Sequence, residues 1–399
     1  MAPLWAAPII AGTLLGGCGS TATAPDPGDA PIGLSELPLT VVDAPVGAER
    51  RLRSPRPATL GLTAEGVPLV STGTTVSALE NSGTRAFTLY AGSGDPTTLG
   101  AVRAIAPRQA GGSWVGASSG LFYTEGDYVA WAGSAAAPLD LDEVASGPFA
   151  GLWMTTAAGL LHAVGTELWT YDGLDGTLDS FAATSSHALV LGSEGAYALT
   201  LTIEGLRAEP LEIADVFAVA VTPGAEWIAS PSGVAVRFAG GDWRALSVDG
   251  APLEAETLVG ASDAAYLVTP AGELLALTPG ASETLIAERL STAVDGPLVA
   301  DPQGGVWSLE GDTLVGRRLE GVASFARDVA PFLAQNCLGC HPTYDQLEVF
   351  KTRASAALSR LQSGDMPRCA GNQLCSPESL PAPSSYAALE RWIQQGQLP

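Results

Sequence analysis

Near the C-terminal end of the chain, two cysteines and a histidine have the spacing used for covalent attachment of a haem. The run Cys337-Leu338-Gly339-Cys340-His341 follows the Cys-x-x-Cys-His pattern of a c-type haem site. The two thiols can form thioethers with the haem vinyl groups, and the histidine can ligate the iron. On a helix these three positions share one face. The sequence therefore predicts one covalent haem c per chain, held by Cys337, Cys340 and His341.

Zinc sites and redox-active dithiols also use closely spaced cysteine pairs. A structural zinc site takes four Cys or His ligands, usually as two short-spaced pairs. The chain has 5 Cys and 3 His, and its sequence contains no second pair with zinc-ligand spacing. A zinc or redox cysteine pair beside an incidental His341 is therefore the weaker alternative.

The second axial ligand of the iron is expected to be Met366. Of the 3 methionines, only Met366 follows the haem motif, and Pro367 limits the backbone freedom beside it. A thioether ligand favours ferrous iron and raises the reduction potential. The alternatives are a packing role for Met366, or ligation of the iron by two histidines. The only other histidines, His162 and His187, both lie far upstream.

Helical patterns surround these ligands. A helix is expected before the motif, a second over 345–362, and a third near the C-terminal end. This order, with a ligand-methionine loop between the last two helices, resembles a small class I cytochrome c domain over 322–399. The resemblance implies a small all-α domain in which the four predicted ligands hold the haem. The apolar faces of the three helices contain Phe325, Val329, Phe332 and Leu333, then Leu347, Phe350, Leu358 and Leu361, and finally Tyr386, Leu389, Trp392 and Ile393.

The cysteine pair Cys369 and Cys375 departs from that family pattern. We interpret it as a disulfide that closes a short loop, with a stabilisation of about 2–4 kcal/mol at most. Such a bond would stiffen the segment that presents Met366. A second metal site is the weaker alternative.

The N-terminal segment resembles the signal of a bacterial lipoprotein. Residues 4–15 form a short apolar stretch, and the letters LGGC follow at 15–18. This length fits a signal peptide better than a membrane span. We expect a signal peptide over 1–17, a lipid on Cys18, and a flexible tether over 18–43. An ordinary cleaved signal with an incidental cysteine is the alternative, because no Lys or Arg precedes the apolar stretch.

Export of this kind also accounts for every cysteine. One is lipidated, two carry haem and two form a disulfide, as an oxidising compartment allows. We therefore expect the protein to be anchored by lipid to a bacterial membrane, facing the periplasm or the cell surface.

From 44 to 320 the sequence predicts an all-β propeller. Short apolar runs alternate with turn residues, and an apolar or aromatic anchor recurs with a glycine six residues later. Successive anchors lie 47, 39, 36, 38, 39 and 32 residues apart, which is typical of propeller blades and predicts seven of them. The glycines should supply the positive φ of a tight hairpin, and the anchors should pack between blades. The pairs are Val67 with Gly73, Trp114 with Gly120, Trp153 with Gly159, Leu189 with Gly195, Trp227 with Gly233, Tyr266 with Gly272, and Leu298 with Gly304.

The net charge is distributed unevenly between the predicted propeller and the segment that follows residue 320. Residues 321–399 are formally neutral, so 1–320 carry the whole net charge of -23. An acidic propeller argues against nucleic acid as a partner and disfavours docking on an anionic membrane, so the lipid would do the anchoring. The charge can simply maintain solubility, or it can steer a basic redox partner.

Three functions remain open from the sequence. We favour an electron-transfer protein in which the haem passes single electrons and the propeller is a scaffold or docking platform. One alternative is a quinohaemoprotein-like propeller dehydrogenase, although the sequence lacks an adjacent cysteine pair, a propeller histidine cluster and a clear Ca²⁺ site. The other is a haem-based binding or sensory lipoprotein. No nucleophile, acid/base pair or phosphate loop stands out, so no catalytic residue is assigned.

Overall fold

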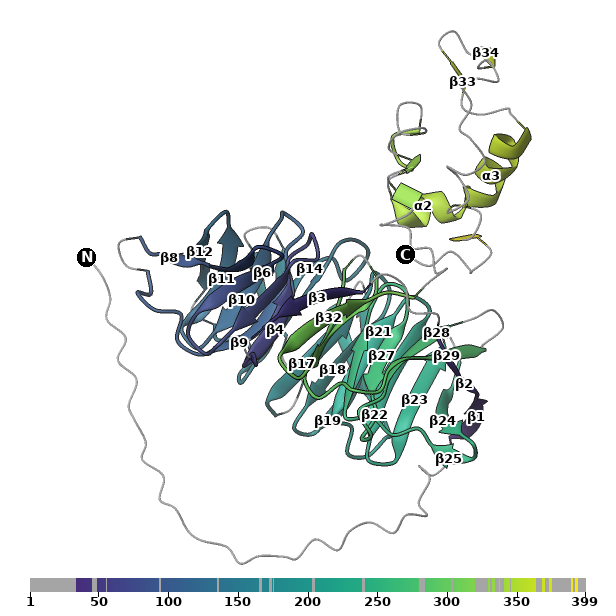
Figure 1. Ribbon diagram of the computed structural model, residues 1–399, viewed down its shortest axis with the longest axis horizontal. Helices are drawn as coiled ribbons and strands as arrows, with labels where there is room; N and C mark the ends of the chain where they lie inside the picture. The colour runs from purple at the N-terminus through teal and green to yellow at the C-terminus, as the bar shows by residue number, and fades with distance from the viewer. Residues whose placement is uncertain are drawn as a thin grey trace, which may run out of the picture.

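The computed structural model describes most of the chain from residue 34 onward (Figure 1). Up to residue 320 the described residues are 34–44, 49–54, 56–92, 95–134, 136–164, 167–171, 174, 176–202, 205–238, 241–279, 284–302 and 304–319. Beyond residue 320 they are 329–330, 332–333, 337, 341–344, 346–363, 368–369, 373–374, 389 and 392–393.

The strands described up to residue 319 form seven blades of a β-propeller, each built on an antiparallel meander. Blade 1 contains β4 (Thr59–Leu62), β5 (Pro68–Ser71), β6 (Val76–Glu80) and β7 (Gly83–Ala86). Blade 2 contains β9 (Val102–Pro107), β10 (Ser113–Ala117), β11 (Gly120–Glu125) and β12 (Tyr128–Ser134). Blade 3 contains β13 (Asp140–Val144), β14 (Gly151–Thr156), β15 (Gly159–Val164) and β16 (Glu167–Tyr171). Blade 4 contains β17 (Leu178–Ala183), β18 (Ala188–Gly192), β19 (Gly195–Thr202) and β20 (Gly205–Pro210).

The last three blades follow the same plan. Blade 5 contains β21 (Ala218–Thr222), β22 (Ala225–Ser230), β23 (Gly233–Phe238) and β24 (Trp243–Val248), with β25 (Ala251–Pro252) paired to β24. Blade 6 contains β26 (Thr257–Gly260), β27 (Ala265–Val268), β28 (Leu274–Pro279) and β29 (Leu285–Ser291). Blade 7 contains β30 (Leu298–Ala300), β31 (Val306–Glu310), β32 (Thr313–Arg317) and, from the N-terminal side of the chain, β3 (Arg50–Arg53).

The first strands of the blades form a closed ring. Each of them contacts the first strand of the next blade, and β30 of blade 7 returns to β4 of blade 1. Backbone hydrogen bonds close the ring as well, because β3 pairs antiparallel with β32 and joins the beginning of the propeller to its last blade. Closure of this kind leaves only the outer strands as sheet edges.

Three short strands add to the outer edges in parallel. They are β1 (Ser35–Leu39) on β24, β2 (Val41–Asp43) on β29, and β8 (Thr88–Tyr90) on β12. The flexible tether was expected to continue to residue 43, whereas residues 35–39 and 41–43 are paired with blades 5 and 6. Leu39 explains the difference, because its side chain is 6% exposed and packs in the core between those blades.

The repeat predicted from the sequence corresponds to the second and third strands of a blade. All seven predicted glycines have positive φ, from +79° at Gly272 to +137° at Gly120, as the hairpin hypothesis requires. The seventh anchor is displaced by one strand, since Leu298 lies in the first strand β30. The equivalent second-strand residue is Trp307 in β31. The local pattern is misleading there because Thr313, not glycine, lies six residues after Trp307, whereas Gly304 happens to lie six residues after Leu298.

The propeller core is divided among the interfaces between blades. Each of its seven hydrophobic clusters joins two neighbouring blades. Trp153 of blade 3 packs against Phe181 of blade 4 with ring centroids 5.1 Å apart, and Trp227 is completely buried between blades 5 and 6. The expectation that anchors pack between blades therefore holds for these residues.

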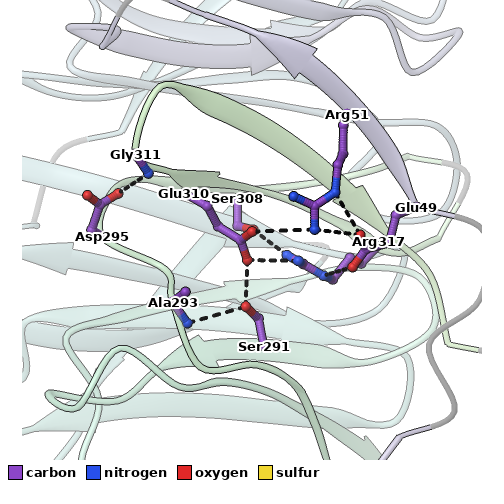
Figure 2. Close-up of polar contacts among 9 residues, drawn as sticks. All are labelled: Glu49, Arg51, Ser291, Ala293, Asp295, Ser308, Glu310, Gly311 and Arg317. Atoms are coloured by element: carbon purple, nitrogen blue, oxygen red, sulfur yellow. Dashed lines mark hydrogen bonds and ion pairs between the residues drawn. The ribbon is translucent and has the colours of Figure 1, made fainter.

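A buried ion network holds the closing strand in place (Figure 2). The Arg317 guanidinium, 3% exposed, donates to Glu49 Oε1 at 2.9 Å and forms an ion pair with Glu310 Oε1 at 2.7 Å. Arg51 of β3 binds the other oxygen of Glu49 at 2.7 Å. Burial opposes ionisation of Glu49, but its bonds with Arg51 and Arg317 prevail and lower its pKa. The network therefore joins the segment around β3 to strands β31 and β32.

The described residues beyond 320 form a separate hydrophobic cluster. The helix expected over 345–362 is divided into α2 (Leu347–Lys351) and α3 (Ala354–Ser363). Thr352 ends α2, and its hydroxyl donates to the carbonyl oxygen of Val349 at 2.9 Å, a side-chain bond that competes with helix continuation. A short hairpin of β33 (Arg368–Cys369) and β34 (Gln373–Leu374) follows, so this part is not purely helical. No helix among the described residues has the length and apolar character needed to cross a membrane.

Candidate functional site

The haem motif begins in a helical turn. The Cys337 amide donates to the carbonyl of Leu333 at 2.7 Å, and the His341 amide donates to the carbonyl of Cys337 at 2.9 Å. These are consecutive i to i+4 hydrogen bonds, so Cys337 and His341 lie one turn apart on the same side of the backbone helix. Cys340 lies outside the described residues. The predicted helical spacing therefore holds for the two motif residues that are described.

An apolar core surrounds the first cysteine. Cys337 is 5% exposed and belongs to a cluster with Leu333, Phe350 and Trp392. Phe350 comes from α2, and Trp392 lies in the C-terminal apolar face expected from the sequence. A haem macrocycle presents a large apolar surface, and an apolar shell around it controls dielectric and solvent access. The environment of Cys337 fits such a group. The remaining buried members of the cluster are Val329, Phe332, Ala354, Ala357, Leu361 and Leu389.

Aromatic rings continue from the motif into this core. The His341 ring stacks on Tyr344 with centroids 4.5 Å apart and an interplanar angle of 10°. Tyr344 contacts Phe350 at 5.1 Å, and Phe350 stacks on Trp392 at 5.8 Å. Tyr344 was not among the sequence-predicted site residues. Its spacing of three residues from His341 was the available signal, and the turn that brings the two rings together is closed by a hydrogen bond from the Tyr344 amide to the His341 carbonyl at 3.0 Å.

Several predicted site residues lie outside the described part of the chain. They are Cys18, Cys340, Met366 and Cys375. Cys369 lies in β33, where its backbone pairs with Gln373, and the hairpin reverses the chain before Cys375. Met366 ligation, the disulfide and the lipidation of Cys18 therefore remain predictions.

The two other histidines belong to propeller blades. His162 is 6% exposed and stacks on Trp153 at 3.8 Å, and its Nε2 is 2.9 Å from the carbonyl oxygen of Ala150. Burial lowers the pKa of His162. His187 lies beside Glu226, with 3.4 Å between Nδ1 and Oε1. Both residues thus have interactions within the propeller.

Cys337 and His341 are a thiol and an imidazole that an i to i+4 backbone hydrogen bond joins, and Cys337 lies in an apolar cluster. This pair is compatible with the thioether and axial contacts of a c-type haem. We therefore interpret Cys337 and His341 as the described half of the predicted site.

The propeller contains two pockets between blades. One of about 420 Å³ lies at blades 4 and 5 and is lined by His187, Glu226 and Arg237 together with Phe149 and Phe238. The Glu226 carboxylate is held by both the Arg237 guanidinium and His187. The other pocket, of about 370 Å³, lies at blades 1 and 2 and is lined by residues that include Arg85 and Arg108. No sequence pattern indicated either pocket, because their residues come from different blades.

Comparison with known proteins concerns the propeller. No family model matches the chain, and no curated protein matches its sequence. Among solved structures, a chain of the mitotic checkpoint complex matches 70% of this chain and 96% of its own length, at 14% identity and a TM-score of 0.47. The β-propeller domain of Cps50 (Swd1) from Myceliophteria thermophila matches 66% and 98%, at 9% identity and 0.45. PorZ, a surface component of the type-IX secretion system of Porphyromonas gingivalis, matches 68% and 39%, at 13% identity and 0.44.

Proposed function

We propose that this chain is an exported, lipid-anchored c-type cytochrome that transfers single electrons through one covalent haem. The observation that carries the proposal is the helical turn that joins Cys337 to His341 inside a Cys-x-x-Cys-His motif. The apolar cluster around Cys337 adds support, since it suits a buried macrocycle. The propeller serves in this proposal as a scaffold or docking platform.

Each proposed site residue has a distinct role. Cys337 and Cys340 would hold the haem through thioethers, and His341 and Met366 would be its axial ligands. The haem supplies reversible one-electron chemistry when it is bound. Phe350 and Trp392 contribute an apolar wall and exclude water, which affects the reduction potential. Tyr344 stacks on the His341 ring and would limit its rotation.

The first test is the mass of the intact protein from a host that matures c-type cytochromes. We expect an increase of one haem, retained under denaturing conditions. Cys337→Ala should weaken or abolish this retention, whereas Cys369→Ala removes a thiol outside the motif and should leave the haem attached. An unchanged mass, or zinc in place of iron, would contradict the proposal.

The second test concerns the axial ligands. The ferric protein should show the weak long-wavelength band of methionine ligation, and Met366→Ala should remove it and open the iron to added ligands. His187→Ala is the control and should leave the spectrum unchanged. If the wild-type protein lacks the band and Met366→Ala changes nothing, Met366 is not the ligand.

The third test concerns the predicted lipid anchor of the protein. Labelled fatty acid should enter the wild-type protein and fail to enter Cys18→Ala. Equal labelling of both proteins would rule out lipidation at Cys18.

A binding or sensory role is the second candidate. The pocket at blades 4 and 5 favours it, because Glu226 and Arg237 form a charge-paired floor beside apolar walls. This role predicts that a small molecule bound by the propeller shifts the haem potential, and that Glu226→Gln removes the shift. If no compound in a metabolite screen shifts the potential, electron transfer alone is favoured.

A further inference from the structure

The outer edges of the blades are protected in different ways. Fifth strands cover blades 2, 5 and 6, and β3 completes blade 7. Among the described strands, β7, β16, β20 and the arginine-rich β3 itself remain as outer edges without a further partner strand. An uncovered edge can pair with another chain, so proteins usually protect it with charge or proline.

Two of these uncovered edges carry polar protection. On β7, Arg85 forms ion pairs with Glu80 at 2.9 Å and Asp127 at 2.7 Å. On β20, Arg207 and Glu209 are exposed and paired at 3.1 Å. Pro210 ends β20 without an amide hydrogen to offer. These two edges therefore discourage strand addition.

The edge of blade 3 lacks such protection and is apolar. On β16, Leu168 is 50% exposed and Trp169 is 53% exposed, and Val164 on the adjoining strand is 48% exposed. Exposed aliphatic and aromatic side chains along a free edge favour pairing with another extended segment. Glu167, at the first position of β16, is its one charged residue.

The register of β16 shows which of its backbone groups face outward. Val164 pairs with Glu167 and closes the β15–β16 hairpin, so this pair exchanges hydrogen bonds and the pairing alternates beyond it. Leu168 and Thr170 then turn their N–H and C=O groups away from β15. The same alternation along β20 of blade 4 places Pro210 where the backbone groups face away from β19. Proline is tolerated there because no hydrogen bond of the sheet needs its missing N–H.

The charge around this edge has one sign. No Lys or Arg occurs between Arg108 and Arg207, a stretch that spans β10 to β19 and includes all of blade 3. Of the acidic residues in this stretch, Glu167, Asp172 and Asp175 lie within β16 or directly after it in the sequence. Asp127 is already paired with Arg85, and Asp140 and Asp142 are buried in the first strand β13. A second copy of this chain would carry the same charge, so repulsion disfavours self-pairing, whereas a basic segment would be attracted.

The strands that cover other edges show how an occupant would bind. All three run parallel to the edge they cover. Each places aliphatic side chains against the blade, such as Leu39 of β1, Val41 of β2 and Leu89 of β8. The fold thus repeatedly accepts a short parallel strand with aliphatic residues.

We propose that the β16 edge of blade 3 is a docking site for an extended basic segment of a partner protein. The segment adds as a fifth parallel strand, its backbone bonds with the outward groups of Leu168 and Thr170, and its aliphatic residues pack on the face of the sheet that carries Trp169. Basic side chains, which alternate with the aliphatic ones along the segment, are attracted by the acidic residues near β16 in the sequence. This inference does not depend on haem binding.

The test uses the full-length protein and a labelled peptide of about nine residues that alternates lysine with leucine. We expect binding in fluorescence anisotropy that weakens as salt rises, and no binding of the matched peptide that alternates glutamate with leucine. Thr170→Pro removes one outward N–H from the edge and should weaken binding about tenfold or more. Ala208→Pro is the matched control, because Ala208 has the equivalent outward position on β20.

Two further measurements keep the test decisive. Trp169→Lys retains the strand while adding a charge to its edge, so it should weaken binding even if Thr170→Pro fails to fold. Circular dichroism should show an intact propeller in each variant that is compared. The proposal is overturned if the lysine peptide does not bind, if Ala208→Pro weakens binding as much as Thr170→Pro, or if sedimentation shows a dimer that Thr170→Pro abolishes.

Discussion

The propeller and the C-terminal segment bury their side chains in different ways. The propeller distributes its apolar residues over seven clusters, each shared by two neighbouring blades. The segment beyond 320 has one cluster, all of whose members lie between residues 329 and 393, and Cys337 is one of them. In the first region stability depends on ring closure, whereas in the second the described core includes Cys337 of the candidate site.

This difference separates the roles of the two regions. A ring of repeated blades can present edges and pockets without disturbing any single core. A small region with few buried side chains is stabilised only marginally by its own core, so the proposed haem would add to the stability of this segment. We therefore expect the two regions to respond separately to the changes below.

Removal of the closing strand should have the largest effect. A fragment that begins after Arg53 lacks β3 and Glu49, so blade 7 loses its outer strand and the ring cannot close. We expect circular dichroism and proteolysis to show an unfolded propeller, while the C-terminal segment still acquires haem. A fragment that begins at Glu49 keeps the closure and should fold. Equal folding of the two fragments would show that closure is dispensable.

Single core truncations should separate the two regions next. Trp392→Ala should destabilise only the haem segment, by about 3–5 kcal/mol, because Trp392 is fully buried in its one cluster. Trp227→Ala removes a buried tryptophan from the propeller and should lower only the propeller transition by a similar amount. Differential scanning calorimetry of the haem-loaded protein measures both transitions. If either variant shifts both transitions equally, the regions share one cooperative unit.

Loss of the buried Arg317 should have the next largest effect. Arg317→Met removes the buried cation between Glu49 and Glu310 and leaves only the exposed Arg51 beside them, so it should destabilise the propeller by about 3 kcal/mol. Arg51→Met removes an exposed cation from the same network and should have a much smaller effect. Urea unfolding of the propeller measures both. A similar loss in the two variants would show that the network acts through surface charge alone.

The smallest effect should depend on pH. Asp142 of β13 accepts a hydrogen bond from the Ala183 amide at 3.0 Å, and burial raises the pKa of Asp142 to about 7. Between about pH 4 and pH 7 the folded protein then holds a proton that the unfolded chain has lost. The free energy of unfolding should therefore fall with rising pH over this range, by up to about 1.4 kcal/mol per pH unit from this group.

Asp142→Asn keeps an acceptor for the Ala183 amide and should remove this component of the pH dependence. The neighbouring Asp140 is also buried, with a raised pKa, and accepts bonds from Ser180 and Phe181 of blade 4. Glu143 on the same strand instead accepts from the Trp114 indole of blade 2. Unfolding midpoints of the wild type and Asp142→Asn, measured from pH 4 to pH 8, should converge at the acidic end. Parallel curves would exclude Asp142 as the titrating group.

Features that depend only on residues close together in the sequence could be predicted from the sequence pattern. A hairpin after Trp114 needs a residue with positive φ, so Gly120 could be identified from spacing alone. The backbone hydrogen bond from His341 to Cys337 agrees with the spacing of the motif, whereas the predicted face that includes Cys340 stays a prediction. The seventh anchor was wrong at Leu298, because Gly304 has the expected spacing from Leu298, whereas Thr313 lies six residues after the true second-strand residue Trp307.

The sequence by itself determined the number of blades, the hairpin glycines and the positions of the thiols and imidazole of a candidate haem site. Each of these depends on residues within a few positions of one another, where chain geometry fixes what is possible. Only the tertiary structure decided that β1 and β2 cover blades 5 and 6, that Arg317 meets Glu49, and that β16 remains an apolar edge. Those outcomes depend on pairing between segments that are distant in the sequence. A local sequence pattern cannot predict such pairing, because these segments bury their side chains and form their hydrogen bonds only when the ring closes.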